Sequence, residues 1–176
     1  MNVKQEIARS ADHFQRIVWP NLSPLLGGGN VIPVETVTDS RMAHILDQLG
    51  GVDIWYVNQE QIFPIASRVQ YGDRAWNTFT IRYARPSGAA TEYDKRLRSI
   101  RNGSLYPRWT IQAYVDDEGR LLTAAAVDTK HLIEVATEHL DQVRDNPADD
   151  VKFLYVHWHQ CDPTHIKRYQ RGVTMT

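Results

Sequence analysis

A carboxylate interrupts a stretch whose residue types are typical of a buried strand, GVDIWYV at residues 51–57. This carboxylate belongs to Asp53, and a second strand is predicted at about residues 62–70. Because side chains alternate along a strand, Ala66, Arg68 and Gln70 share one face of that second strand. Asp53 is tolerated there if a cation meets it, either a metal ion or Arg68. The alternative is that Asp53 caps a neighbouring backbone segment, while Arg68 and Gln70 line a polar face of the sheet.

Imidazole and thiol groups cluster near the C-terminus, in YVHWHQCDPTH at residues 155–165. On a strand, His157, His159 and Cys161 would point to one face, with Asp162 and His165 close behind, and these residue types bind zinc. A pair of histidines near a phosphate could instead act as general acid and base. The single cysteine and the irregular spacing match no established zinc pattern. An edge strand with hydrogen-bonded histidines is therefore the alternative interpretation.

Basic residues are concentrated in one segment, although the net charge of the chain is only -1. Residues 82–108 contain seven Lys or Arg and two acids, whereas residues 109–150 contain ten acids. Arginine contacts phosphate and exposed aromatic rings stack on bases, so a basic segment next to aromatic residues predicts a nucleic-acid-binding surface. The alternative is a solvated helix face. The predicted nucleic-acid contacts are Arg68, Arg74, Trp76, Arg96, Arg98 and Arg101.

The elements that must position these residues follow from the spacing of apolar residues and from turn and capping signals. Helices are predicted from Ile7 to Val18, from Thr38 or Asp39 to Leu49, from Thr91 to about Asn102, and from Thr129 to Val143. Strands are predicted at residues 52–57, 62–70, 78–85, 108–115, 120–127 and 151–161, followed by a polar tail. Thr91 and Asp94 have the spacing of a capping box, which marks the start of the third helix.

This order of elements indicates an α/β or α+β fold, with a mixed central sheet flanked by helices. A chain of 176 residues, 42% hydrophobic, is long enough for one well-packed core, so residues 1–176 are expected to form a single domain. No stretch approaches the run of about 20 apolar residues that a membrane span needs, and the N-terminus lacks an apolar signal sequence. We therefore expect a soluble, cytoplasmic protein without membrane contact. The lone cysteine fits a reducing compartment.

The order helix, Asp-bearing strand, second strand, third strand, helix and strand resembles the PD-(D/E)XK, or restriction-endonuclease-like, nuclease superfamily over roughly residues 1–127. The resemblance implies that an Asp on one strand and an acid-x-Lys on the next bind Mg²⁺ or Mn²⁺ for hydrolysis of phosphodiester bonds. Asp53 occupies the first position. Arg68-Val69-Gln70 stands where the acid-x-Lys would be, so a cation replaces one metal ligand.

Other residues could complete such a site. Carboxylates could come from Glu6, Asp47 or Glu92, and Lys95, one helical turn after Glu92, could replace the missing lysine. Gln70 could ligate a metal or donate to a phosphate, and Arg68 would clamp a phosphate or pair with an acid. The expected catalytic residues are Asp53, Gln70 and Lys95; the expected metal ligands are Asp53, Glu6, Asp47 and Glu92, with His157, His159 and Cys161 as a second candidate site.

Two functional hypotheses follow. The leading one is a divergent metal-dependent nuclease, acting on DNA rather than RNA. Arg68 at the acid position favours the other, a catalytically inactive nuclease-like domain that binds nucleic acid or a protein partner. The nuclease hypothesis requires a second carboxylate close enough to Asp53 for both to bind one metal ion. If Asp53 lies beside Arg68 with no other carboxylate near it, the binding domain is favoured. A homodimer, frequent among nucleases of this fold, is an option under both.

Overall fold

Two β-sheets and the helices packed on them make up the α+β fold of the computed structural model, which describes residues 9–37, 39, 41, 42, 45, 46, 51–146 and 150–171. The larger sheet has the order β1-β2-β3-β5-β6-β9 and the smaller one the order β4-β8-β7. The strands are β1 (Asn30–Pro33), β2 (Ile54–Val57), β3 (Ile62–Tyr71), β4 (Thr78–Ala84), β5 (Trp109–Val115), β6 (Leu121–Asp128), β7 (Val143–Asp145), β8 (Lys152–His157) and β9 (Ile166–Gln170).

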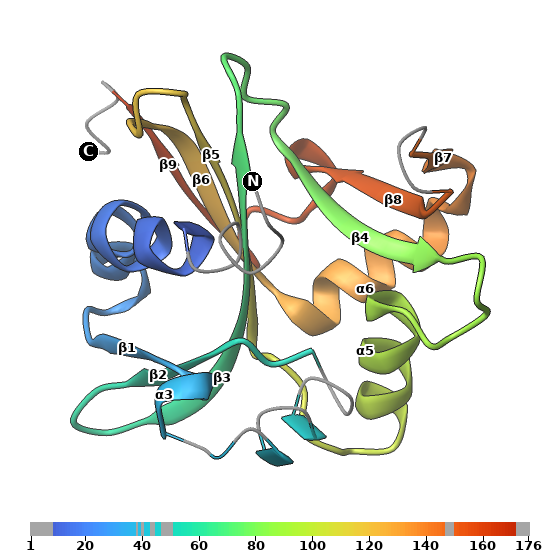
Figure 1. Cartoon of the computed structure of the whole chain (residues 1–176), viewed down its shortest axis with the longest axis horizontal. Coiled ribbons are helices and arrows are strands. Elements are labelled where there is room, and N and C mark those ends of the chain that lie inside the picture. Colours follow the sequence, from blue (N-terminus) through green and yellow to red (C-terminus); the bar gives the residue numbers. More distant parts are fainter. Residues whose placement is uncertain are drawn as a thin grey trace.

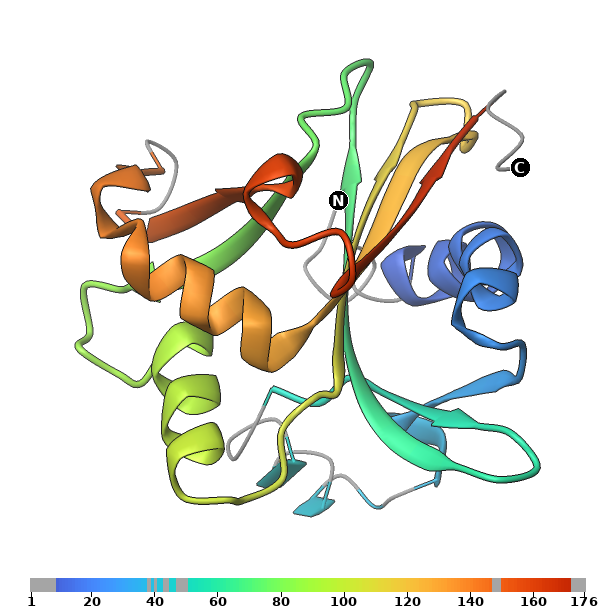
Figure 2. The ribbon, with the colours of Figure 1, turned by 180° about the vertical axis from the view of Figure 1, so that it is seen from behind.

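Helices cover both faces of the larger sheet. In Figure 1 the N-terminal helices lie on one side of this sheet, and α5, α6 and the smaller sheet lie on the other. Figure 2 shows the same arrangement from behind. The helical segments are η1 (Phe14–Val18), α2 (Trp19–Leu22), η2 (Ser23–Leu26), α3 (Val34–Val37), α5 (Glu92–Arg101), α6 (Thr129–Glu138), η3 (Leu140–Gln142) and η4 (Trp158–Gln160).

The strand pairing explains how the chain reaches the smaller sheet. β3 and β5 are parallel neighbours, and the crossover between them contains β4 and α5. The other paired strands are antiparallel, including β4 with β8, where Phe79 lies opposite Val156. α5 therefore returns the chain from the smaller sheet to the larger one.

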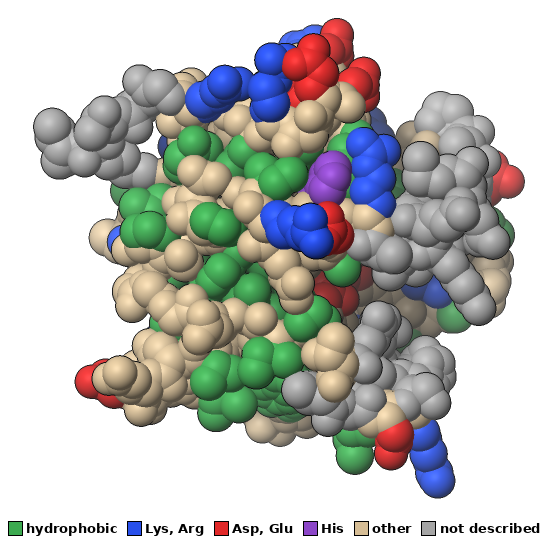
Figure 3. All heavy atoms as spheres, turned by 60° about the vertical axis from the view of Figure 1, so that its left-hand side comes forward, with side chains coloured by type: hydrophobic (Ala, Val, Ile, Leu, Met, Phe, Trp, Pro, Cys, Tyr) green, Lys and Arg blue, Asp and Glu red, His purple; other side chains and the backbone are tan. Residues whose placement is uncertain are grey.

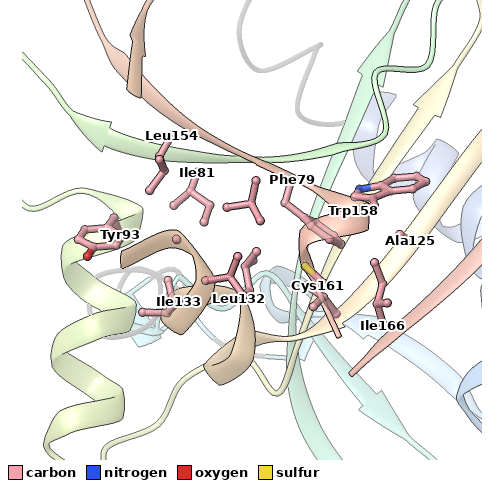
Figure 4. Close-up of a cluster of buried hydrophobic side chains, with 14 of the residues drawn as sticks. Phe79, Ile81, Tyr93, Ala125, Leu132, Ile133, Leu154, Trp158, Cys161 and Ile166 are labelled. Carbon is pink, nitrogen blue, oxygen red and sulfur yellow. The ribbon is translucent and has the colours of Figure 1, made fainter. Parts of the chain in front are cut away.

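Side chains alternate between the two faces along β5 and β6, and each face contributes to a separate hydrophobic core. Ala124 and Ala126 of β6 face the N-terminal helices, whereas Ala125 and Val127 face α6 and the smaller sheet. Small alanine side chains let helices pack closely on both faces of this central strand. On the second face, Leu132 of α6 lies among side chains of β4 and β8, as Figure 4 shows.

Local capping signals place the two long helices. Thr91 and Asp94 form the predicted capping box at the start of α5. The N-cap of α6 is Asp128 and not Thr129 as predicted, because the Asp128 carboxylate accepts a hydrogen bond from the His131 N–H at 3.0 Å. The hydroxyl of Thr129 is instead bonded to that of Thr110 at 2.9 Å.

Several predicted bounds are wrong, and each has a local reason. α6 ends at Glu138 and not at Val143 as predicted, and Leu140 beyond its end is 41% exposed. The last predicted strand stops at His157, because residues 158–160 turn into η4, and β9 lies in the segment predicted as a tail. The short strands β1 and β7 were not predicted. Most of the helix predicted after Thr38 lies outside the described residues, as does the start of the first helix.

Within the described ranges, no helix has the length and apolar character needed to cross a membrane.

Candidate functional site

A cavity of about 380 Å³ opens where the β2–β3 hairpin, the end of β4 and the start of α5 meet. Of the described residues, five basic side chains and two carboxylates line it. The basic residues are Arg68, Arg82, Arg85, Lys95 and Arg96, and the acids are Asp53 and Glu92. The cavity thus contains three of the residues expected to form a nuclease site, Asp53, Glu92 and Lys95, together with Arg68.

Each element places its residue for an identifiable reason. Glu92 is the first residue of α5, where a carboxylate is favoured by the helix dipole, and Arg96 lies one turn later on the same face. Arg68 projects from β3 toward this helix. Arg82 lies beside a β-bulge near the end of β4, and Arg85 follows that strand directly.

Glu92 is the centre of an ion-pair network. Its Oε2 lies 2.9 Å from Nη2 of Arg68, and its Oε1 lies 2.6 Å from Nη2 of Arg96. The backbone N–H of Arg82 also donates to Oε2, at 3.3 Å. Burial raises the pKa of Glu92, but the nearby charges of Arg96, Arg68 and Arg82 and this hydrogen bond outweigh burial and lower its pKa from 4.5 to about 2. Glu92 is therefore an anion at every physiological pH.

Arg96 is the most deeply buried charged residue of the cavity. Its side chain is 2% exposed, and only its Nη2 reaches Glu92. The buried Nε and Nη1 of Arg96 have no hydrogen-bond partner in the part of the chain that the structure describes. Gly51, at φ +65°, lies against this guanidinium: a Cβ at Gly51 would be 3.9 Å from its Nε. The Nε of Arg85 is likewise buried without a partner among the described residues.

Asp53 lies immediately before β2 and is exposed. Its Oδ2 accepts a hydrogen bond from the backbone N–H of Ser67 on β3, at 2.9 Å. The carboxylate therefore caps a neighbouring backbone segment, as the alternative interpretation proposed. Asp53 also lines the cavity that holds Glu92 and Lys95.

The described donor groups do not fit a Mg²⁺ or Mn²⁺ ion. Such ions need several oxygen ligands, and both oxygens of Glu92 are engaged by guanidinium groups. Among the described residues, no three His, Cys, Asp or Glu side chains gather closely enough to hold a metal. Glu6 and Asp47, the other expected ligands, lie outside the described residues.

Gln70, expected near the scissile phosphate, does not line the cavity. Its Oε1 accepts a hydrogen bond from Nε2 of the buried Gln112 on β5, at 3.0 Å. Gln112 in turn receives a hydrogen bond from the backbone N–H of Thr80 on β4, at 3.4 Å. Gln70 thus belongs to a polar link between the two sheets.

The predicted nucleic-acid contacts fall into two groups. Arg68 and Arg96 line the cavity, whereas Arg98 and Arg101 are exposed on α5. Arg74 and Trp76 lie in the loop between β3 and β4, with the guanidinium carbon of Arg74 4.1 Å from the centroid of the Trp76 ring. Trp76 is 59% exposed, although the Arg74 guanidinium lies over its ring.

Some basic side chains outside the cavity are paired with acids. The face shown in Figure 3 carries blue and red groups next to each other among scattered hydrophobic areas. Ion pairs such as Arg16 with Asp12 and Arg120 with Asp116, at 2.8 and 2.7 Å, show this pairing at the surface. The cavity differs from these one-to-one pairs because the basic groups that line it outnumber its acids.

The histidine and cysteine residues near the C-terminus do not share one strand face. His157 ends β8 and His159 lies in η4, with their rings stacked at 5.3 Å between centroids. Cys161 is buried in the core beside Leu132 and Ile166, and burial raises the pKa of its thiol to about 11 (Figure 4). Metals bind the thiolate, so this environment disfavours Cys161 as a ligand. The expected second metal site thus loses the geometry on which it depended.

Sequence reasoning counted Arg82 and Arg85 only as members of a basic segment. Both residues reach the cavity because β4 belongs to the smaller sheet and not to the larger one. No local sequence pattern shows which sheet a strand joins. Lys95, expected to replace the missing catalytic lysine, is only 8% exposed. Part of the basic segment at residues 82–108 is therefore buried in the wall of the cavity.

No protein-family profile and no curated protein sequence matches this chain.

Proposed function

We propose that this protein binds nucleic acid through phosphate groups, on a nuclease-like scaffold that has been kept for recognition. The observation that carries the proposal is the excess of basic side chains around one cavity, with Glu92 committed to two arginines. Arginine side chains held in place lose little freedom on binding an anion, and they offer paired donors to phosphate oxygens. DNA is the first nucleic acid to test.

The experiment compares duplex and single-stranded DNA and RNA by fluorescence anisotropy. Affinity should fall steeply as salt rises from about 50 to 200 mM, because phosphate contacts release counterions. Arg85→Gln should weaken binding by about tenfold or more, as expected for loss of a charged hydrogen bond, and reduce the salt slope by about one. Arg16→Gln, an exposed change in η1 on the other side of the larger sheet (Figure 1), is the matched control. Equal affinity of both variants and the wild type would contradict the proposal.

Trp76, exposed in the loop before β4 and so at the opposite end of that strand from Arg85, is expected to stack on a base of the bound strand. Trp76→Ala should cost about 1–3 kcal/mol of binding free energy to single strands, since base stacking on an aromatic ring contributes that much. Leu105→Ala removes another exposed apolar side chain, 40% exposed, and should leave the affinity unchanged. Titrations of both variants at one salt concentration provide the comparison. A Trp76→Ala variant with wild-type affinity would exclude this loop from the interface.

Metal-dependent cleavage is the second candidate function. Its support is that Asp53, Glu92 and Lys95 line the same cavity, although Glu92 is held by arginines. If it occurs, labelled nucleic acid should be cut with Mg²⁺ or Mn²⁺ but not with chelator, and Asp53→Asn should abolish cutting. The asparagine keeps an oxygen that can accept from the Ser67 N–H, so the fold should persist. Cleavage that survives in Asp53→Asn would remove Asp53 from the reaction.

A further inference from the structure

The unpartnered nitrogens of the cavity identify the kind of anion that it can hold. Nε and Nη1 of Arg96 and Nε of Arg85 are buried donors without acceptors among the described residues. A buried donor on a charged group is costly when it is left unsatisfied. Oxygens of a bound anion between these two residues would satisfy donors that the described side chains do not.

Charge distinguishes between the two forms of phosphate in nucleic acid. Among the residues that the structure describes, the five basic and two acidic side chains leave an excess of three positive charges around the cavity. An internal phosphodiester carries a single negative charge, whereas a phosphomonoester carries about 1.5 to 2 at neutral pH. The monoester therefore compensates more of the excess, and its additional terminal oxygen can accept from a further guanidinium.

Size points in the same direction. A volume of about 380 Å³ is at the lower end of the roughly 300–1,000 Å³ that small-molecule sites occupy. A site of this size holds one nucleotide more readily than a continuous strand passing through it. Glu92 acts as a positioning residue here, because its ion pairs fix Arg68 and Arg96 on either side of it.

We propose that the cavity binds a phosphomonoester, the terminal phosphate of a nucleic-acid strand or the phosphate of a free nucleotide. This inference rests on the proposed function and specifies the end of the strand as the part recognised.

The test compares one single-stranded oligonucleotide with a 5′-phosphate, with a 3′-phosphate and with hydroxyl ends, alongside adenosine monophosphate, by calorimetric titration of the full chain. A phosphorylated end should improve affinity by at least about tenfold, as expected for charged hydrogen bonds. Arg85→Gln and Arg96→Gln should abolish this advantage, whereas Arg16→Gln, exposed in η1 on the other side of the larger sheet (Figure 1), should keep it. Arg85 is only partly buried, so its variant serves as the test if Arg96→Gln fails to fold.

The outcomes separate this inference from the proposed function. Equal affinity for phosphorylated and hydroxyl ends, still weakened by Arg85→Gln, would overturn the inference and leave nucleic-acid binding intact. Binding of adenosine monophosphate that requires Arg85, without binding of any oligonucleotide, would overturn nucleic-acid binding and support a free-nucleotide site. Absence of binding by every probe would overturn both.

Discussion

Replacing Glu92 with glutamine is expected to lower the free energy of unfolding by about 3 kcal/mol near neutral pH, because removal of one partner of a buried ion pair leaves the other charge uncompensated. Arg96 is 2% exposed and has Glu92 as its ion-pair partner, so its charge would be buried without an anion beside it. Arg68, 27% exposed, would lose the same partner but could reach water. Urea denaturation of the variant and the wild type measures the difference.

The effect of Glu92→Gln should depend on pH in a direction set by the lowered pKa. A carboxyl with a folded-state pKa of about 2 and an ordinary pKa of 4.5 contributes its full stabilisation above about pH 4.5. That contribution is lost as the pH falls toward 2, so the variant and the wild type should converge in acid. Glu118→Gln, at an exposed ion pair with Arg120, should change stability by less than about 0.5 kcal/mol at any pH. A constant gap between Glu92→Gln and the wild type down to pH 2 would contradict the role given to Glu92.

Local patterns predicted the parts of this fold that neighbouring residues determine. The Thr91 and Asp94 capping box marks the start of α5, and the hairpin of β5 and β6 follows from two apolar runs around DDEG at residues 116–119. The α+β class follows from the same order of elements. These features depend on contacts within a few residues, and such contacts are what a sequence pattern records.

The pairing of strands that are far apart in the sequence could not be predicted from local patterns. β4 pairs with β8 although residues 85–151 separate the two strands in the sequence, and this pairing creates the second sheet that carries Arg82 to the cavity. β9 was missed because IKRYQ has the polar composition of a tail, yet it pairs with β6 as an edge strand. Alternation predicted a common face for Arg68 and Gln70, but only Arg68 reaches the cavity, because Gln112 of the adjacent strand binds Gln70.

For the expected nuclease residues too, spacing within one helix was predictable, whereas contacts between distant segments were not. Glu92 and Lys95 were assigned to one face of a helix from their spacing, and the structure brings them to the cavity beside Asp53. The arginines that surround Glu92 come from β3 and α5, and they change its chemistry from a metal ligand to the anchor of a basic site.

Phe79→Ala is expected to reduce the free energy of unfolding by about 4 kcal/mol, within the range of about 3–5 kcal/mol for truncating a buried Phe. Phe79 is 1% exposed on β4 and lies 5.9 Å from Trp158 between ring centroids. Its core also contains Leu132 of α6 and Val127 of β6, so the cavity left by truncation would weaken both sheets together.

The same variant tests whether the two sheets unfold as one domain. A shared core predicts a single cooperative transition for Phe79→Ala, shifted to lower temperature, whether it is followed by circular dichroism or by tryptophan fluorescence. Lys152→Ala, at an exposed position on β8, should leave the transition almost unchanged. Two separate transitions would show that the smaller sheet folds independently. In a single transition, β4 cannot loosen without displacing Arg82 from the cavity, so the stability of the second core and the integrity of the binding site would be lost together.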